Sequence, residues 1–238
     1  MIKQFIKFLL IKISRIIYWA TPEESKKKSL SLLNIKLTEN LAEETYKNFK
    51  DHLKKSLLFD SVEEIREYAI KTSLLNDKKN EFYYLEFGVW VGISTNFFSR
   101  YVKKLYAFDS FEGLNEDWAG TNRAIGDFNL NKKVPKLNKN IEPVVGKVED
   151  TLENYLKLHN PKINFIHFDM DTYNPTKFTL EKIKPYLVEG AIIIFDELYN
   201  FIGWENGEYK ALNEVFKDDE FEYKAFLVNG PQCVIKIK

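Results

Sequence analysis

The sequence predicts an α/β fold in which a mostly parallel sheet has helices on both faces. From residue 82 onward, short apolar runs such as FYYLEF and AIIIFD alternate with segments of helical spacing, a pattern typical of strands that are buried on both faces. Near the end, FEYKAFLV and QCVIKIK are joined through NGP, which predicts an antiparallel hairpin that closes the sheet. With 45% hydrophobic residues in 238 positions, the chain can bury one full core.

Residues 1–77 are expected to be helical and to form an N-terminal extension that serves as a cap or in oligomerisation. After a first helix, LTENLAEETYKNFKDHL and SVEEIREYAIKTSLL both have helical spacing. Ser61 is the expected cap of the second of these segments, with Glu64 as its partner in a capping box. We therefore divide the chain into this extension and a main domain, 78–238.

The first 19 residues predict an amphipathic helix with a basic stripe. Lys3, Lys7, Lys12 and Arg15 interrupt every apolar window that could span a membrane. TPEESKKK follows in place of a small-residue cleavage site, so we do not expect an export signal. Two interpretations remain open, which are packing against the domain or a partner subunit and peripheral contact with a membrane surface.

The remaining elements follow in alternating order. Strands are expected at 82–87, 104–109, 141–146, 163–169 and 191–196, and helices at 93–103, 148–158, 175–187 and 208–216. The polar segment 111–140 is long enough to form a lid over a binding site.

The composition excludes some classes of function. Lys+Arg and Asp+Glu are each 35, and this balance argues against a nucleic-acid binder, which is usually basic. The single cysteine, Cys233, allows neither a disulfide framework nor a cysteine zinc site, and it is expected to be a small core residue. We expect a reducing, cytoplasmic setting.

The turn after the first predicted strand of the sheet has the position of a nucleotide site. Glu86, Gly88 and Gly92 lie at this junction, where α/β sheets bind ligands. A dinucleotide motif aligned on Gly88 needs glycine at two further positions, where this chain has Trp90 and Ile93. The turn therefore argues against NAD or FAD.

A nucleoside ligand without phosphates does not need those glycines. Asp109 ends the second strand about 20 residues after the turn, where an acid can accept both hydroxyls of a ribose. The glycine turn and this acid together suit S-adenosylmethionine.

Two carboxylates end neighbouring predicted strands. One helical crossover joins the strand that ends at Asp169 to the strand that ends at Asp196, so both acids should emerge at one sheet edge. A divalent cation would relieve their repulsion, and oxygen ligands from these acids and Glu197 favour Mg²⁺ over zinc. His167 is expected to be a satisfied core histidine. Asp171 is expected to cap the following helix rather than to bind metal.

These residues carry a resemblance to a known family. The segments LEFGVWVGIST, AFDSFEGL, GKVEDTL and FIHFDMDTYNPTKFTLEKIKPYLVEGAIIIFDE, with IKFLLIKISRIIY near the N-terminus, resemble the class I S-adenosylmethionine-dependent O-methyltransferases related to the macrocin and mycinamicin sugar methyltransferases. The resemblance covers residues 82–200 and, more weakly, the N-terminal helix. It implies that 78–238 is a methyltransferase domain with a Rossmann-like, seven-stranded sheet, and that Mg²⁺ chelates the acceptor hydroxyl.

The resemblance also implies roles for individual residues. The implied cofactor contacts are Glu86, Phe87, Gly88, Gly92, Ser94, Asp109, Ser110, Val148 and Asp169. The implied metal ligands are Asp169, Asp196 and Glu197, and Glu197 stands where the macrolide enzymes have a second aspartate. Asp169 is in addition the implied general base, which would accept the proton of a sugar hydroxyl that the metal activates.

The expected acceptor, again by resemblance, is a sugar that is nucleotide-activated or a precursor of a surface polysaccharide or natural product. Trp118, Arg123, Tyr173 and Trp204 are the expected acceptor contacts, although ordinary loop packing also explains both tryptophans. We expect a homo-oligomer and no nucleic-acid partner.

Two other functions stay open at this point. DMD could be the DxD motif of a metal-dependent glycosyltransferase, with Asp169 and Asp171 as its acids, but this leaves the turn with Glu86 unexplained. The chain could also be a non-catalytic module that retains the cofactor fold and uses its basic N-terminal helix for a partner.

Overall fold

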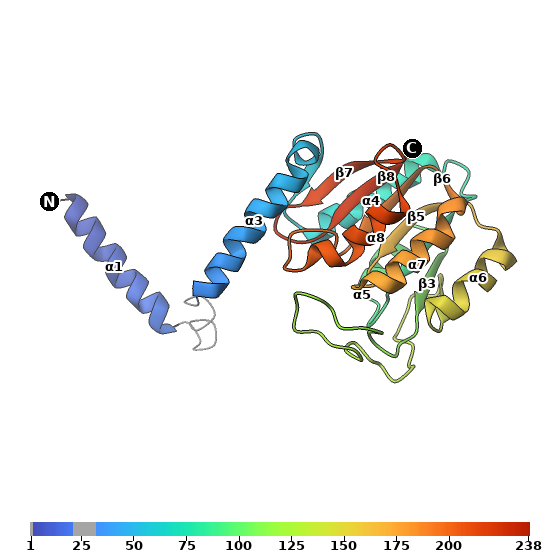
Figure 1. Cartoon of the computed structure of the whole chain (residues 1–238), viewed down its shortest axis with the longest axis horizontal. Helices are drawn as coiled ribbons and strands as arrows, with labels where there is room; N and C mark the ends of the chain where they lie inside the picture. The colour runs from blue at the N-terminus through green and yellow to red at the C-terminus, as the bar shows by residue number, and fades with distance from the viewer. Residues whose placement is uncertain (1, 21–31) are drawn as a thin grey trace. The chain divides into compact units, whose positions relative to one another are not determined.

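A computed structural model describes residues 2–20 and 32–238 of the chain, and Figure 1 shows the arrangement of its elements. The helices are α1 (Ile2–Ala20), α3 (Leu32–Leu53), α4 (Val62–Asn76), α5 (Ile93–Ser99), α6 (Val148–His159), α7 (Tyr173–Ile183) and α8 (Glu208–Val215), with short 3-10 helices η1 (Lys184–Tyr186) and η2 (Trp204–Asn206). The strands are β1 (Leu57–Phe59), β2 (Tyr83–Phe87), β3 (Leu105–Asp109), β4 (Ile141–Val145), β5 (Ile163–Phe168), β6 (Leu187–Phe195), β7 (Phe221–Leu227) and β8 (Cys233–Ile237). No helix among the described residues has the length and apolarity that a membrane crossing requires.

The chain forms two compact units, Met1–Asn48 and Phe49–Lys238. The second contains the whole sheet and also α4, which contacts β5, β6 and β7. Ser61 caps α4 as predicted and accepts a hydrogen bond from the backbone N–H of Glu64. The compact unit around the sheet therefore starts before residue 78, where we placed the beginning of the main domain.

The described part of the chain forms one eight-stranded sheet in the order β1-β7-β8-β6-β5-β2-β3-β4. Its strand pairs are parallel except β6 with β8 and β7 with β8. The predicted α/β class, the parallel sheet and the antiparallel C-terminal hairpin are confirmed.

The sheet has one strand more than the seven implied by the resemblance, because β1 adds a short edge strand. It pairs parallel with β7, and Leu57 lies opposite Ala225. Leu57 and Leu58 are both more than half exposed. A strand of three residues, two of them exposed, has neither the length nor the burial pattern that a sequence signal needs, so the prediction for this segment was wrong.

Helices cover both faces of the sheet (Figure 1), and the alternation of side chains along β3 shows the two layers. Leu105 and Ala107 belong to the apolar cluster that contains residues of α4 and α5. Tyr106 and Phe108 point the other way and pack against Tyr155 of α6. On that second face α6 contacts α7, and α7 contacts α8.

Four phenylalanines stack across the middle of the sheet in a continuous row, which we call the phenylalanine ladder: Phe108, Phe87, Phe168 and Phe195. Their ring centroids are 4.7, 5.4 and 5.3 Å apart from β3 to β6, and all four side chains are buried. Each ring comes one residue before a position at the carboxyl edge of the sheet. The ladder thus lies one residue inside the carboxyl edge of the sheet.

Candidate active site

The carboxyl edge of the sheet brings together acids from three strands. Asp109 ends β3, and Asp169 and Asp196 directly follow β5 and β6. β5 and β6 are parallel neighbours, with Phe168 opposite Phe195. The backbone N–H of Asp196 continues the hydrogen bonding between β5 and β6 by donating to the carbonyl of Phe168, at 2.9 Å. The predicted pairing of these two strand ends is confirmed.

Gly88 follows β2 and lies against the end of β5. Its φ of +89° is in the left-handed region, and a Cβ at this position would overlap the backbone carbonyl of Asp169. Gly92 is the N-cap of α5, also with positive φ. Both glycines are therefore required by the fold of this turn, and Gly88 allows Asp169 to lie next to the end of β2.

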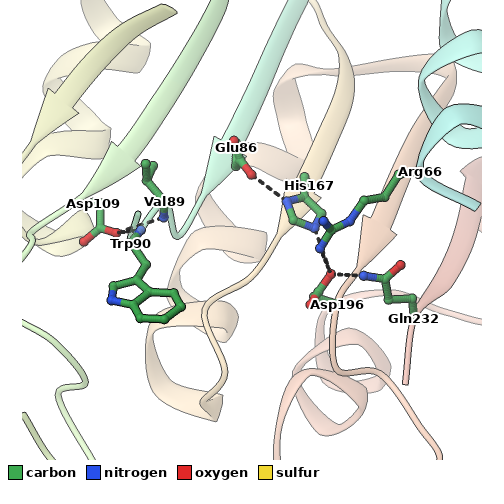
Figure 2. A network of polar contacts seen from close by, with 8 residues as sticks. All are labelled: Arg66, Glu86, Val89, Trp90, Asp109, His167, Asp196 and Gln232. Atoms are coloured by element: carbon green, nitrogen blue, oxygen red, sulfur yellow. Dashed lines mark hydrogen bonds and ion pairs between the residues drawn. The ribbon is translucent and has the colours of Figure 1, made fainter. Parts of the chain in front are cut away.

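The carboxylate of Asp109 holds the glycine turn (Figure 2). Its Oδ2 accepts hydrogen bonds of 2.8 Å from the backbone N–H groups of Val89 and Trp90. Its Oδ1 accepts one of 2.6 Å from the backbone N–H of Phe111. A carboxylate has about four acceptor positions. Roughly one acceptor position of Asp109 therefore stays available for a ligand, whereas the sequence predicted that this acid could accept both hydroxyls of a ribose.

A cavity of about 400 Å³ opens at this edge of the sheet. This size is within the usual range for small-molecule sites. Several predicted residues line it, namely Gly88, Ser94, Asp109, Ser110, Trp118, Val148, Asp169, Asp196 and Glu197. Glu86, Phe87 and Gly92 do not line it: Glu86 is paired with His167, Phe87 belongs to the phenylalanine ladder, and Gly92 caps α5.

One oxygen of Asp196 accepts three hydrogen bonds (Figure 2). Oδ1 lies 2.8 Å from Nη2 of Arg66 and 3.1 Å from Nε2 of His167, and it also accepts from the amide of Gln232. Burial alone would raise the pKa of Asp196, but His167 and then Arg66 outweigh burial and hold this pKa well below its usual range. Asp196 is therefore ionised, and Arg66 and His167 balance its negative charge within the protein.

His167 joins Asp196 to Glu86 beneath the cavity. Its Nδ1 lies 2.8 Å from Oε1 of Glu86, and both side chains are fully buried. Burial lowers the pKa of His167, but the hydrogen bonds to Asp196 and Glu86 raise it to about 9. The prediction that His167 is a satisfied core residue is confirmed.

A second group of carboxylates makes no ion pair of this kind among the described residues, although the charge of His167 acts on Asp169 from a distance. Asp169, Asp171 and Glu197 offer oxygens that lie within 4.8 Å of one another. Burial raises the pKa of Asp169 and of Glu197 well above the usual value, and it raises the pKa of Asp171 to about 7. Oε2 of Glu197 is buried and has no hydrogen-bond partner among the described residues. We call these three residues the acid cluster.

The ligand trio predicted from the sequence is split in the structure. Possible ligand atoms of Asp169, His167 and Asp196 lie close together, and those of Asp169, Asp171 and Glu197 form a second such group. The prediction that Asp171 caps the next helix was wrong. Thr172 is the N-cap residue of α7, and the helix begins at Tyr173. With φ of +62° at Asp171, the chain turns before the helix, and this residue lines the cavity.

The four predicted acceptor residues are in different surroundings. Trp118 lines the large cavity and a smaller one of about 230 Å³ beside it, and Tyr173 lines the smaller cavity. Arg123 is half-exposed and lies over the ring of Phe128. Trp204 is only 2% exposed and packs in the core, so its prediction as a sugar-stacking surface was wrong.

Three polar groups around the acids were not predicted from the sequence. Arg66 belongs to α4 and Gln232 directly precedes β8, and they are 130 and 36 positions from their partner Asp196. Glu208 in α8 is fully buried and accepts a hydrogen bond of 3.0 Å from the backbone N–H of Glu197. Arg66 and Glu208 are charged residues on the apolar faces of predicted helices, and this position was the available signal that they are buried and paired.

Comparisons with known proteins agree with this architecture. The chain is similar to the crystal structure of CalS11, described as a calicheamicin methyltransferase, with a TM-score of 0.59 and 22% identity over 87% of this chain and 93% of that chain. An apo structure of CalS11, described as a TDP-rhamnose 3'-O-methyltransferase, gives a TM-score of 0.53 and 21% identity over 87% of this chain and 95% of that chain. The O-methyltransferase NovP gives a TM-score of 0.56 and 19% identity over 74% of this chain and 79% of that chain. At these identities the likeness shows the fold.

Residues 85–198 match the protein family described as "Methyltransferase domain". The matched segment lies within the sheet unit and runs from β2 to the residues that directly follow β6. None of the curated proteins compared with the chain matches it.

Proposed function

We propose that this protein transfers the methyl group of S-adenosylmethionine to a hydroxyl of a sugar, and that the reaction requires Mg²⁺. One observation carries the proposal. The glycine turn, Asp109 and the acid cluster all meet at one cavity of a methyltransferase domain. The glycosyltransferase alternative explains the acids only.

The residues of the turn fit a nucleoside cofactor. Asp109 lines the cavity and keeps about one acceptor position, which suits one hydroxyl of a ribose. Ser94 in the first turn of α5 and Val148 at the start of α6 line the same cavity and are buried. These side chains would bind the cofactor and exclude water from it.

The acid cluster fits a hard divalent cation. Its carboxylates are oxygen ligands, as Mg²⁺ prefers, and the buried Oε2 of Glu197 lacks a partner among the described residues. Asp196 already has Arg66 and His167 as counter-charges. We therefore propose Asp169, Asp171 and Glu197 as the ligands, so that Asp171 replaces Asp196 in the set implied by the resemblance. A bound Mg²⁺ would lower the pKa of the acceptor hydroxyl and fix its position.

Asp169 is suited to accept the proton of this hydroxyl. Without a cation, burial and then the charge of Asp196 raise its pKa. A bound Mg²⁺ would lower this pKa and keep the carboxylate ionised, as a general base requires. Its backbone is fixed between the end of β2 and the end of β5, because its N–H donates to the carbonyl of Phe87 at 2.8 Å. A fixed base of this kind favours in-line transfer.

The smaller cavity fits the acceptor. It shares Asp171, Thr172 and Trp118 with the large cavity, so a molecule bound there would adjoin the acid cluster. Its lining combines aromatic rings with carboxylates and an amide, and these are the groups that bind a sugar by its faces and hydroxyls: Trp118, Tyr173, Phe201, Glu116, Asp117 and Asn206.

Methyl transfer from labelled S-adenosylmethionine tests the proposal directly. The acceptor panel should contain nucleotide-linked sugars, among them TDP-linked deoxysugars because CalS11 is described as acting on TDP-rhamnose, and polysaccharide precursors. Label should appear in a sugar, disappear with chelator and return with Mg²⁺. Asp219→Asn, which changes an exposed turn, is the matched control for variants of the acid cluster.

Calorimetry on the same protein separates the alternatives. Tight binding of a nucleotide sugar without binding of S-adenosylmethionine would support the glycosyltransferase. Binding of the cofactor with no methylated product over the whole panel would support a non-catalytic module.

A further inference from the structure

The first helix, α1, differs in charge from the rest of the chain. It has four basic residues, Lys3, Lys7, Lys12 and Arg15, and no acidic residue, while the whole chain has a net charge of zero. Charges at spacings of three to five residues do not suit a helix that crosses a bilayer. They suit a helix whose polar face stays in contact with water.

The opposite face of α1 is apolar and exposed. Ile6, Leu9, Ile13 and Ile16 recur at spacings of three and four residues, so they form one stripe along the helix. Their side chains are between 44 and 65% exposed. Leu10 beside the stripe is 60% exposed. Such a run of large exposed apolar side chains indicates a surface that binds a partner.

Charge decides between the candidate partners. A second copy of α1 would bring four more positive charges and no negative ones to the interface, so like charges oppose self-association. A surface of acidic lipids offers negative charge to the basic residues and acyl chains to the stripe. Trp19 near the end of α1 is 83% exposed, and tryptophan is enriched at the interface between lipid and water.

We propose that α1 lies in the plane of an anionic membrane surface, with its isoleucine and leucine stripe in the acyl-chain boundary and its basic residues at the lipid headgroups. The helix would then keep the methyltransferase unit at a membrane that displays acidic lipid. This inference does not depend on the proposed substrate or on the metal.

Vesicle co-sedimentation of the full-length protein tests the proposal. The vesicles are phosphatidylcholine with or without about one third phosphatidylglycerol. The protein should bind the anionic vesicles, and its partition coefficient should fall with added salt. Lys12→Glu with Arg15→Glu should lower the partition coefficient at least about tenfold, and Leu9→Asp with Ile13→Asp should lower it as strongly.

The control is Lys78→Glu with Lys79→Glu, which makes the same change of charge at an exposed turn of the sheet unit and should bind like the wild type. Binding of S-adenosylmethionine, measured in parallel, should be the same in all variants and reports that they fold. Equal binding to neutral and anionic vesicles overturns the proposal. The proposal is also overturned if a larger species sediments without lipid and Leu9→Asp with Ile13→Asp abolishes it. This result would show that a second copy covers the stripe.

Discussion

Arg66 in α4 donates a hydrogen bond of 2.8 Å to Oδ1 of Asp196. Arg66 lies outside the segment that matches the methyltransferase family, whereas Asp196 lies within it. The side chains are 14 and 17% exposed, so this is a largely buried ion pair.

Replacing Arg66 should be costly because it leaves the buried charge of Asp196 without one of its two counter-charges. We expect Arg66→Met to lower the free energy of unfolding by about 3 kcal/mol, measured by urea denaturation. Arg100→Met, at an exposed position at the end of α5, should change it by less than about 0.5 kcal/mol. If Asp196→Asn added to Arg66→Met restores no stability, the pairing does not explain the loss.

Two glycines with nearly equal φ separate backbone strain from overlap. Gly126 has φ of +87° and no atom within 4 Å of an added Cβ, whereas a Cβ on Gly88 overlaps the carbonyl of Asp169. Gly126→Ala should cost about 1 kcal/mol of stability from strain alone. Gly88→Ala should cost at least about 3 kcal/mol, since overpacking is added. Equal losses in thermal or urea unfolding would contradict the close approach of β2 and β5.

The choice of metal ligands can be tested without turnover. Mg²⁺ at about 100 times its Kd should stabilise the wild type by about 2.7 kcal/mol, read as a rise in Tm. Asp171→Asn should lose this response, because it removes one ligand of the acid cluster. Asp196→Asn should lower the Tm in the absence of Mg²⁺ and keep the response. The reverse result would restore the ligand set inferred from the sequence.

Asp169→Asn tests the proposed base. The amide cannot accept the hydroxyl proton, so kcat should fall by about 10²-fold to 10⁴-fold even at Mg²⁺ concentrations that saturate the weakened metal site. The dissociation constant of S-adenosylmethionine and the urea midpoint should stay close to those of the wild type. Activity within about threefold of the Asp219→Asn control would exclude Asp169 as the base.

Replacing Trp118 should weaken binding of the acceptor rather than binding of the cofactor. Its indole N–H is buried and has no hydrogen-bond partner among the described residues. Trp118→Phe should raise the KM for the sugar about tenfold through loss of this donor, with little change in cofactor affinity. Trp204→Phe should lower stability and leave the KM unchanged, because this ring packs in the core against Phe49 and Tyr209.

Local sequence patterns predicted the strand ends well and their surroundings poorly. Apolar runs that stop at Asp109, Asp169 and Asp196 located the carboxyl edge, because buried parallel strands depend on local hydrophobicity. The bonds from Arg66 and Gln232 to Asp196 depend on how distant segments pack, and no local pattern contains that information. For this reason the neutralisation of Asp196, and the resulting split of the predicted ligand trio, became visible only in the structure.

Loop residues were harder to predict for a similar reason. Trp204 was expected at the acceptor because it follows the second acid in a polar segment. The structure places it in a short 3-10 helix whose aromatic neighbours include Phe49, far away in sequence. An aromatic residue in a loop can bind a ligand or anchor the loop, and only its neighbours distinguish the two cases.

The phenylalanine ladder has a consequence for the acids. Its four rings are closed to solvent and directly precede Gly88, Asp109, Asp169 and Asp196. Phe108 also lines the cavity, so the carboxylates at this edge lie beside an apolar surface. Charges next to such a surface interact more strongly than charges in open water, and a bound cation would therefore be held more firmly.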